Sequence, residues 1–148
     1  MILYDADCGL CKWLLSGLLW WDRAERLDPV ALQRPQAARI LAEIIPAERF
    51  ASWHLIAPTG SRLSGGDAIP PLLRLLPGGR LPGAALAGFP RLTDRGYRWV
   101  AEHRSLLSRW VPATLKRSAS ARVHVREQRA LRDAPAVKTG PVTESGAP

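Results

Sequence analysis

The stretch Met-Ile-Leu-Tyr-Asp-Ala-Asp-Cys-Gly-Leu-Cys, residues 1–11, combines a short apolar run with two closely spaced cysteines. The first five residues predict a buried strand. From Leu10 the apolar residues recur at helical spacing as far as Trp21, which predicts a helix directly after the strand. Cys8 and Cys11 therefore stand where a first strand passes into a first helix, a context typical of redox-active cysteine pairs.

The spacing of the two cysteines suits thiol-disulfide exchange. Residues three apart on a helix lie on one face, so the two sulfurs can form a disulfide with little backbone movement. Cys8, at the helix N-terminus, faces unpaired N–H groups and the positive end of the helix dipole, which favour the thiolate. We expect Cys8 to attack a substrate disulfide and Cys11 to displace the reduced substrate.

Two acidic residues, Asp5 and Asp7, flank the cysteine pair. Because the helix dipole favours a carboxylate at its N-terminus, the first interpretation of Asp7 is a helix cap. The second is that either carboxylate accepts a proton from Cys11 during resolution. A carboxylate beside a thiolate also opposes the ionisation of the sulfur, and the sequence leaves this balance open.

Other interpretations of the cysteines have less support. Both thiols suit a buried core, since free cysteine is among the most buried residue types. A zinc or iron site needs further ligands, and His54, His103 and His124 show no paired spacing with the cysteines. Haem attachment needs a histidine where the chain has Lys12. We expect no metal and no cofactor.

The remaining hydrophobic pattern predicts further strands and helices. Strands are expected at residues 27–32, 52–57 and 61–63, and helices at residues 35–45, 69–76 and 93–111. Residues 77–90 predict a loop with a helical turn near 84–87. This order indicates an α/β fold of the thioredoxin type, with a small mixed sheet flanked by helices and an additional C-terminal helix.

The basic charge lies in the C-terminal third of the chain. The net charge is +8, and residues 91–132 carry eleven basic and three acidic side chains. After Pro112 the aromatic residues stop, and Ala, Arg, Ser, Thr and Pro dominate. We therefore expect one domain at residues 1–112 and a basic, disordered tail at 113–148, with transient helix near 121–132.

Composition excludes several classes of protein. A hydrophobic content of 47% suits a globular chain. No apolar run approaches the roughly 18 residues that span a bilayer, so no membrane span is expected. Two cysteines are too few for a disulfide scaffold or a four-cysteine zinc site. No signal-peptide pattern is visible, so we expect a cytoplasmic protein.

The six tryptophans raise an alternative function. Trp13 and Trp21 are expected in the core, and Trp20, Trp99 and Trp110 at least partly exposed. Arginines beside the last two suggest a non-catalytic module whose basic C-terminal third docks an acidic partner or nucleic acid. We favour a solvated helix face and a basic tail as their explanation. Without a helix-turn-helix or RNA-recognition motif we do not expect nucleic-acid binding.

The segment Tyr-Asp-Ala-Asp-Cys-Gly-Leu-Cys, residues 4–11, resembles the signature of the DCC family of thiol-disulfide oxidoreductases, which is named for its Asp-Cys-x-x-Cys motif. Supporting segments are residues 64–68, 96–101 and 103–104. The resemblance covers residues 2–112. It implies a thioredoxin-like fold, a redox role for Cys8 and Cys11, and a protein or small-molecule disulfide or thiol as substrate; the electron donor stays unknown.

Residues 52–73 are also similar to the second half of a glutaredoxin, where a Gly-Gly segment and a helix start bind a carboxylate of glutathione. This likeness implies substrate binding at Gly65, Gly66 and Asp67, although the Asp67 carboxylate opposes an anion there. Thioredoxin-like enzymes place a cis-proline opposite the cysteines, where this chain has Trp53 and His54. We expect these two residues near the substrate, with a structural role as the alternative for His54.

Overall fold

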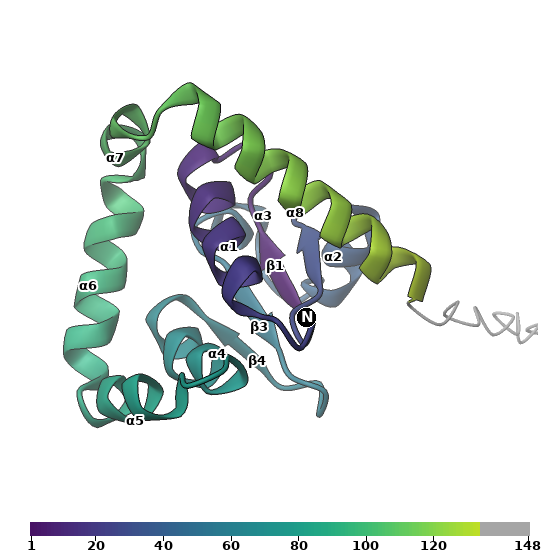
Figure 1. Ribbon diagram of the computed structural model, residues 1–148. Coiled ribbons are helices and arrows are strands. Elements are labelled where there is room, and N and C mark those ends of the chain that lie inside the picture. The colour runs from purple at the N-terminus through teal and green to yellow at the C-terminus, as the bar shows by residue number, and fades with distance from the viewer. Residues whose placement is uncertain (134–148) are drawn as a thin grey trace, which may run out of the picture.

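The computed structural model describes residues 1–133, which contain a four-stranded mixed sheet (Figure 1). The strands are β1 (Ile2–Tyr4), β2 (Pro29–Ala31), β3 (His54–Ile56) and β4 (Arg62–Ser64), in the order β2-β1-β3-β4. Strand β1 runs parallel to β2 and antiparallel to β3, and β3 and β4 form an antiparallel hairpin. This sheet confirms the predicted α/β class and is consistent with a thioredoxin-like fold.

Helices surround the sheet. They are α1 (Gly9–Trp21), α2 (Pro35–Ile40), α3 (Pro46–Arg49), α4 (Ile69–Leu75), α5 (Arg80–Gly88), α6 (Pro90–Glu102), α7 (Arg104–Trp110) and α8 (Ala113–Asp133), with a 3₁₀ helix η1 (Gly65–Ala68) before α4. Helices α5, α6 and α7 follow one another along one side of the molecule, and α8 returns across α1 (Figure 1). Within residues 1–133, no helix is both long and apolar enough to cross a membrane.

The central strand β1 is buried on both faces of the sheet. Ile2 and Tyr4 point into the larger core cluster, which also contains residues of α1, α4 and α8. Leu3, between them, points to the other face and packs with Ala37 and Leu41 at α2. A strand covered on both faces needs a continuous apolar run, which explains why these residues do not alternate with polar ones.

Helix α1 buries a different face from the one that the sequence predicted. Trp13 and Trp21, expected in the core, are 40% and 36% exposed, whereas Leu15 and Ser16 are buried. Apolar residues surround most of α1, so their spacing alone does not identify the buried face. Helix α8 packs on α1, and Arg122 of α8 donates a hydrogen bond to the Ser16 hydroxyl at 3.1 Å.

The prediction of a disordered tail is wrong for residues 113–133, which form α8. Ala119 and Val123 are buried where α8 packs against α1 and β2. Their small side chains give a weak hydrophobic signal in a polar sequence, which explains the error. Residues 134–148, the rest of the predicted tail, lie outside the described part of the chain.

Two charged side chains of α8 form buried ion pairs with the N-terminal part of the chain. The buried Glu127 carboxylate accepts hydrogen bonds from the Ala31 backbone N–H and from Arg34 Nε, both at 2.8 Å. Arg126 Nη2 lies 3.2 Å from the carboxylate of the fully buried Asp22. These partners are about a hundred residues apart in sequence, so no local pattern predicts them.

Three other segments differ from prediction. Residues 80–88 form α5 rather than a loop, because Gly83 lets α5 approach α4; a Cβ on Gly83 would lie 2.8 Å from the Pro70 carbonyl oxygen. The long helix expected at 93–111 begins at Pro90 and is divided at His103 into α6 and α7. Helix α2 ends at Ile40, and turns follow it instead of the helix expected as far as residue 45.

The predicted exposure of three tryptophans is confirmed for Trp20, Trp99 and Trp110.

Replacing Gly66 with alanine is expected to lower the free energy of unfolding by about 1–3 kcal/mol, the usual cost of overpacking. A Cβ at Gly66 would lie 2.5 Å from the Asp94 Cα of α6, so backbone has to move. The matched control is Gly17→Ala in α1, where nothing lies within 4 Å and higher helix propensity predicts a gain of roughly 0.5–1 kcal/mol. Denaturant unfolding measures both; equal effects at the two sites would contradict the packing of α6 on η1.

Candidate active site

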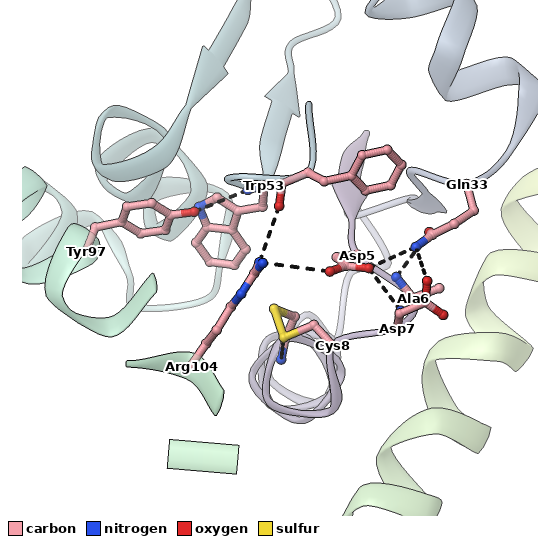
Figure 2. The surroundings of a disulfide bond; sticks show 10 residues. Asp5, Ala6, Asp7, Cys8, Gln33, Trp53, Tyr97 and Arg104 are labelled. Carbon is pink, nitrogen blue, oxygen red and sulfur yellow. Dashed lines mark hydrogen bonds and ion pairs between the residues drawn. A yellow bond between two sulfur atoms is a disulfide. The ribbon is translucent and has the colours of Figure 1, made fainter. Parts of the chain in front are cut away.

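Cys8 and Cys11 form a disulfide at the start of α1, directly after the turn that follows β1 (Figure 2). Their Cα atoms are 5.2 Å apart, and both residues are half-buried. Cys8 is the N-cap of α1, and its Sγ accepts a hydrogen bond from the Cys11 backbone N–H at 3.1 Å. The helix is therefore capped by the sulfur of Cys8 and not by Asp7, whose carboxylate faces another partner.

That partner is Gln33, just beyond the end of β2. Its Nε2 donates to Asp5 Oδ1 at 2.8 Å and to Asp7 Oδ2 at 3.1 Å, and its Oε1 accepts from the Ala6 N–H at 3.2 Å (Figure 2). Asp5 Oδ1 also accepts the Asp7 N–H at 3.0 Å. These bonds hold the turn between β1 and α1, and they leave Asp7 exposed and the Asp5 side chain only 16% exposed.

Arg104, the first residue of α7, brings a positive charge to the cysteines. Its side chain extends past the disulfide toward Asp5, and Nη1 lies 3.9 Å from Asp5 Oδ2 (Figure 2). The same nitrogen donates to the Phe50 carbonyl oxygen at 3.3 Å. Arg104 therefore offsets the negative charge of Asp5 beside the sulfurs.

A pocket of about 580 Å³ opens beside the disulfide. Its walls come mainly from apolar side chains of α1, α4, α5 and α6, which include Leu10, Leu14, Ile69, Leu86, Leu92 and Val100. Cys11, Asp5 and Arg104 form part of the same wall. The sequence did not predict this pocket, because the residues of α5 were expected to form a loop.

A family model described as DCC1-like thiol-disulfide oxidoreductase matches residues 2–110. The chain belongs to this family. The match runs from β1 to the end of α7 and leaves α8 outside. It confirms the predicted family, and the Cys8–Cys11 disulfide corresponds to the expected N-terminal Cys-x-x-Cys pair. Comparison with curated proteins finds no match, and comparison with solved structures finds none either.

Trp53, which was expected near the substrate, lines the pocket of this DCC1-like protein. Its backbone N–H donates to the Tyr97 hydroxyl and its Nε1–H donates to the Gly65 carbonyl oxygen, both at 3.2 Å. The Trp53 ring also stacks on the Tyr97 ring, with centroids 6.1 Å apart. Tyr97 of α6 therefore fixes the indole as a wall of the pocket, a role that the sequence analysis did not assign to it.

His54, by contrast, has no free ring nitrogen for a substrate. The side chain is buried; its Nδ1 lies 2.7 Å from the Ser64 hydroxyl and its Nε2 lies 3.0 Å from the Arg49 carbonyl oxygen. Because a carbonyl only accepts, Nε2 carries the proton and Nδ1 accepts from Ser64. Burial lowers the pKa of His54 below its usual 6.5, which agrees with a neutral ring. The structure thus assigns His54 the structural role that the sequence left as its alternative.

The stability of the protein is expected to fall as the pH decreases through about 6.5, in part because of His54. With the pKa of His54 lowered in the folded protein, the unfolded chain takes up a proton at higher pH than the folded one. The contribution of His54 to stability is complete above the pKa that this residue has in the unfolded chain. It is lost as the pH falls toward its pKa in the folded protein. Urea unfolding from about pH 8 to about pH 5 should show a shallower pH slope for His54→Gln, whereas His124→Gln, at an exposed position, keeps the parental slope. Equal slopes for all three proteins would contradict this role.

Helix α6 packs against Gly65 and Gly66, two of the three residues of the expected glutathione-type site. A Cβ at Gly65 would lie 3.2 Å from the Tyr97 ring, and Gly66 packs directly on the Asp94 backbone. Asp67 is exposed and lies inside η1, whose N-cap is Ser64; the N-cap of α4 is Ala68. The two glycines allow close packing of α6, and binding of a carboxylate beside them stays a prediction.

The part of the chain that the structure describes contains no candidate metal site. Across residues 1–133, no group of three or more His, Cys, Asp or Glu side chains is arranged to hold an ion.

Proposed function

We propose that this protein is an enzyme that exchanges disulfides with thiol or disulfide substrates through Cys8 and Cys11. The observation that carries the proposal is the position of Cys8 Sγ as the cap of α1, where it accepts the Cys11 N–H. In the reduced protein, the same N–H group and the helix dipole stabilise a thiolate at Cys8. The disulfide partner lies one helical turn away, so the pair closes without rearrangement of the helix.

The reaction transfers two electrons from the cysteine pair to a substrate disulfide. The Cys8 thiolate attacks one substrate sulfur, the substrate S–S bond breaks, and the other substrate sulfur leaves as a thiolate. The Cys11 thiolate then attacks Cys8 Sγ in the mixed disulfide. This second step forms the Cys8–Cys11 bond and releases the remaining substrate sulfur as a thiolate. Each step is reversible, so the same pair also oxidises dithiols.

We propose that Asp5, rather than Asp7, takes the proton from Cys11. Asp5 lines the same pocket wall as Cys11, whereas Asp7 is exposed and bonded to Gln33. A base must reach the proton directly or through one water, which favours Asp5. Arg104 near Asp5 Oδ2 reduces the repulsion between this carboxylate and a thiolate.

The contacts of the basic C-terminal third favour a disulfide-exchange enzyme over a module that docks an acidic partner or nucleic acid. Four of its arginines contact other elements of the same chain, namely Arg104, Arg122, Arg126 and Arg129. Part of the basic charge is therefore used to hold the helices together. The cytoplasmic location stays a prediction.

Catalysed reduction of insulin by dithiothreitol tests the proposal. The purified protein should accelerate the reduction well above the rate with dithiothreitol alone. The control is the same protein reduced and then alkylated at both cysteines, which should give only the uncatalysed rate. The function proposed here would be refuted by an unmodified protein that gives no acceleration.

A further inference from the structure

The two sulfurs of the Cys8–Cys11 disulfide have different surroundings. Cys8 caps α1 and does not line the apolar pocket, whereas Cys11 forms part of its wall. A molecule bound in the pocket therefore lies against Cys11 and not against Cys8. The function proposed above assigns the attack on a substrate disulfide to Cys8 and gives Cys11 no ligand of its own.

Several polar groups of the pocket already bond to other parts of the chain. The Thr93 hydroxyl donates to backbone carbonyl oxygens at 3.0 and 3.1 Å, and the Tyr97 hydroxyl accepts the Trp53 N–H. Arg104 contacts Asp5 and a backbone carbonyl. The rest of the lining is mainly apolar. A ligand gains most here by burying apolar surface, at roughly 25 cal/mol for each Å².

We propose that this pocket binds the apolar body of a small thiol or disulfide molecule and presents its sulfur to Cys11. The proposal rests on the redox function of the pair. A volume of about 580 Å³ matches the roughly 300–1,000 Å³ of small-molecule pockets. The rim exposes large apolar side chains, with Leu92 67%, Phe89 63% and Leu14 40% exposed, which a bound apolar molecule would cover.

The capped position of Cys8 makes it the better leaving group. When a ligand thiolate attacks Cys11 Sγ, the Cys8–Cys11 bond breaks and its electron pair passes to Cys8, whose thiolate accepts the Cys11 N–H. A second ligand thiolate then attacks the ligand sulfur and displaces Cys11. Two ligand thiols become one disulfide, the pair gains two electrons, and the two protons released by the ligand balance those taken up by the cysteines.

The proposal is tested with two single-thiol variants, Cys8→Ser and Cys11→Ser. Each is modified with benzyl methanethiosulfonate and with 2-hydroxyethyl methanethiosulfonate, which attach an apolar or a polar group to a cysteine. Intact-mass measurements give the rate constants. We expect the benzyl-to-hydroxyethyl rate ratio to be about tenfold or more larger at Cys11 than at Cys8, because only Cys11 lines the pocket.

A substitution in the pocket distinguishes binding in the pocket from the general reactivity of the Cys11 thiol. In the Cys8→Ser background, Leu92→Gln should lower the ratio at Cys11 by about threefold or more. The control is Leu81→Gln, at a leucine that is 82% exposed on α5 and does not line the pocket, and it should leave the ratio within about twofold. Both leucines are exposed, so both variants are expected to fold.

Equal ratios at the two cysteines, or equal effects of Leu92→Gln and Leu81→Gln, would overturn the assignment. The reagents carry their own leaving group, so these rates do not depend on redox activity of the pair. If Cys11 prefers the benzyl reagent but the protein does not exchange disulfides, the proposed function is refuted and the apolar binding site is retained. Disulfide exchange without selectivity at Cys11 would refute the apolar site alone.

Discussion

Replacing either cysteine of the pair with serine is expected to lower the catalysed rate of insulin reduction by about 10³-fold or more. Each variant keeps one sulfur, but the internal step that closes the disulfide is lost. An oriented group on the same chain acts at effective molarities of roughly 10⁵ M or more, and millimolar external thiol cannot replace it. The rate is measured from the turbidity of the precipitating insulin chains.

The two serine variants also differ from each other. Cys11→Ser should accumulate a mixed disulfide between Cys8 and the substrate, visible as an added mass that reductant removes, because no second sulfur resolves it. The fold is checked by comparing the thermal unfolding of each variant with that of the reduced parent protein. If a folded single-cysteine variant reduced insulin at the parental rate, the two-cysteine mechanism would be wrong.

Replacing Glu127 with alanine is expected to lower the free energy of unfolding by about 3 kcal/mol, within the usual range for breaking a buried ion pair. The Glu127 carboxylate accepts the Ala31 N–H and Arg34 Nε, and it lies within hydrogen-bond distance of the Tyr4 hydroxyl at 3.4 Å. Removing it leaves buried donors of both β1 and β2 without a partner. Burial and this carboxylate also raise the pKa of Tyr4 well above its usual value, so the phenol stays un-ionised.

Two further variants distinguish the loss of the buried ion pair of Glu127 from the loss of a negative charge in general. Glu127→Gln keeps an acceptor for the Ala31 N–H and should lose less, about 1–2 kcal/mol. Asp94→Ala removes an exposed ion pair with Arg98 and should change stability by less than about 1 kcal/mol. Urea unfolding measures all three. A loss for Glu127→Ala no larger than that for Asp94→Ala would contradict the account of α8 as part of the folded core.

The sequence predicted the cysteine site well because its determinants are local. The apolar run of β1, the turn and the start of α1 lie within residues 1–11, and the spacing of Cys8 and Cys11 fixes their shared helix face. The strands at residues 52–57 and 61–63 were predicted for the same reason, because the apolar residues of β3 and β4 and the turn between them lie close together in sequence.

The parts that the sequence did not predict depend on contacts between distant residues. The pairs of Glu127 with Arg34 and of Arg126 with Asp22 hold α8 in place, and neither has a local signal. Gly83, in a segment whose glycines suggested a loop, instead allows α5 to pack closely on α4. Helices α5 and α6 supply much of the pocket, so the site next to Cys11 was not predictable without them.

The most direct test of the central claim is the redox equilibrium of Cys8 and Cys11. The protein is equilibrated in buffers of graded thiol-to-disulfide ratio, free thiols are trapped with an alkylating mass tag, and the tags are counted. We predict one reversible two-electron transition from zero tags to two, with a midpoint among those of known oxidoreductases, roughly −120 to −270 mV. Two thiols that take up both tags under every mild oxidising condition would contradict the account and leave the cysteines as part of the core.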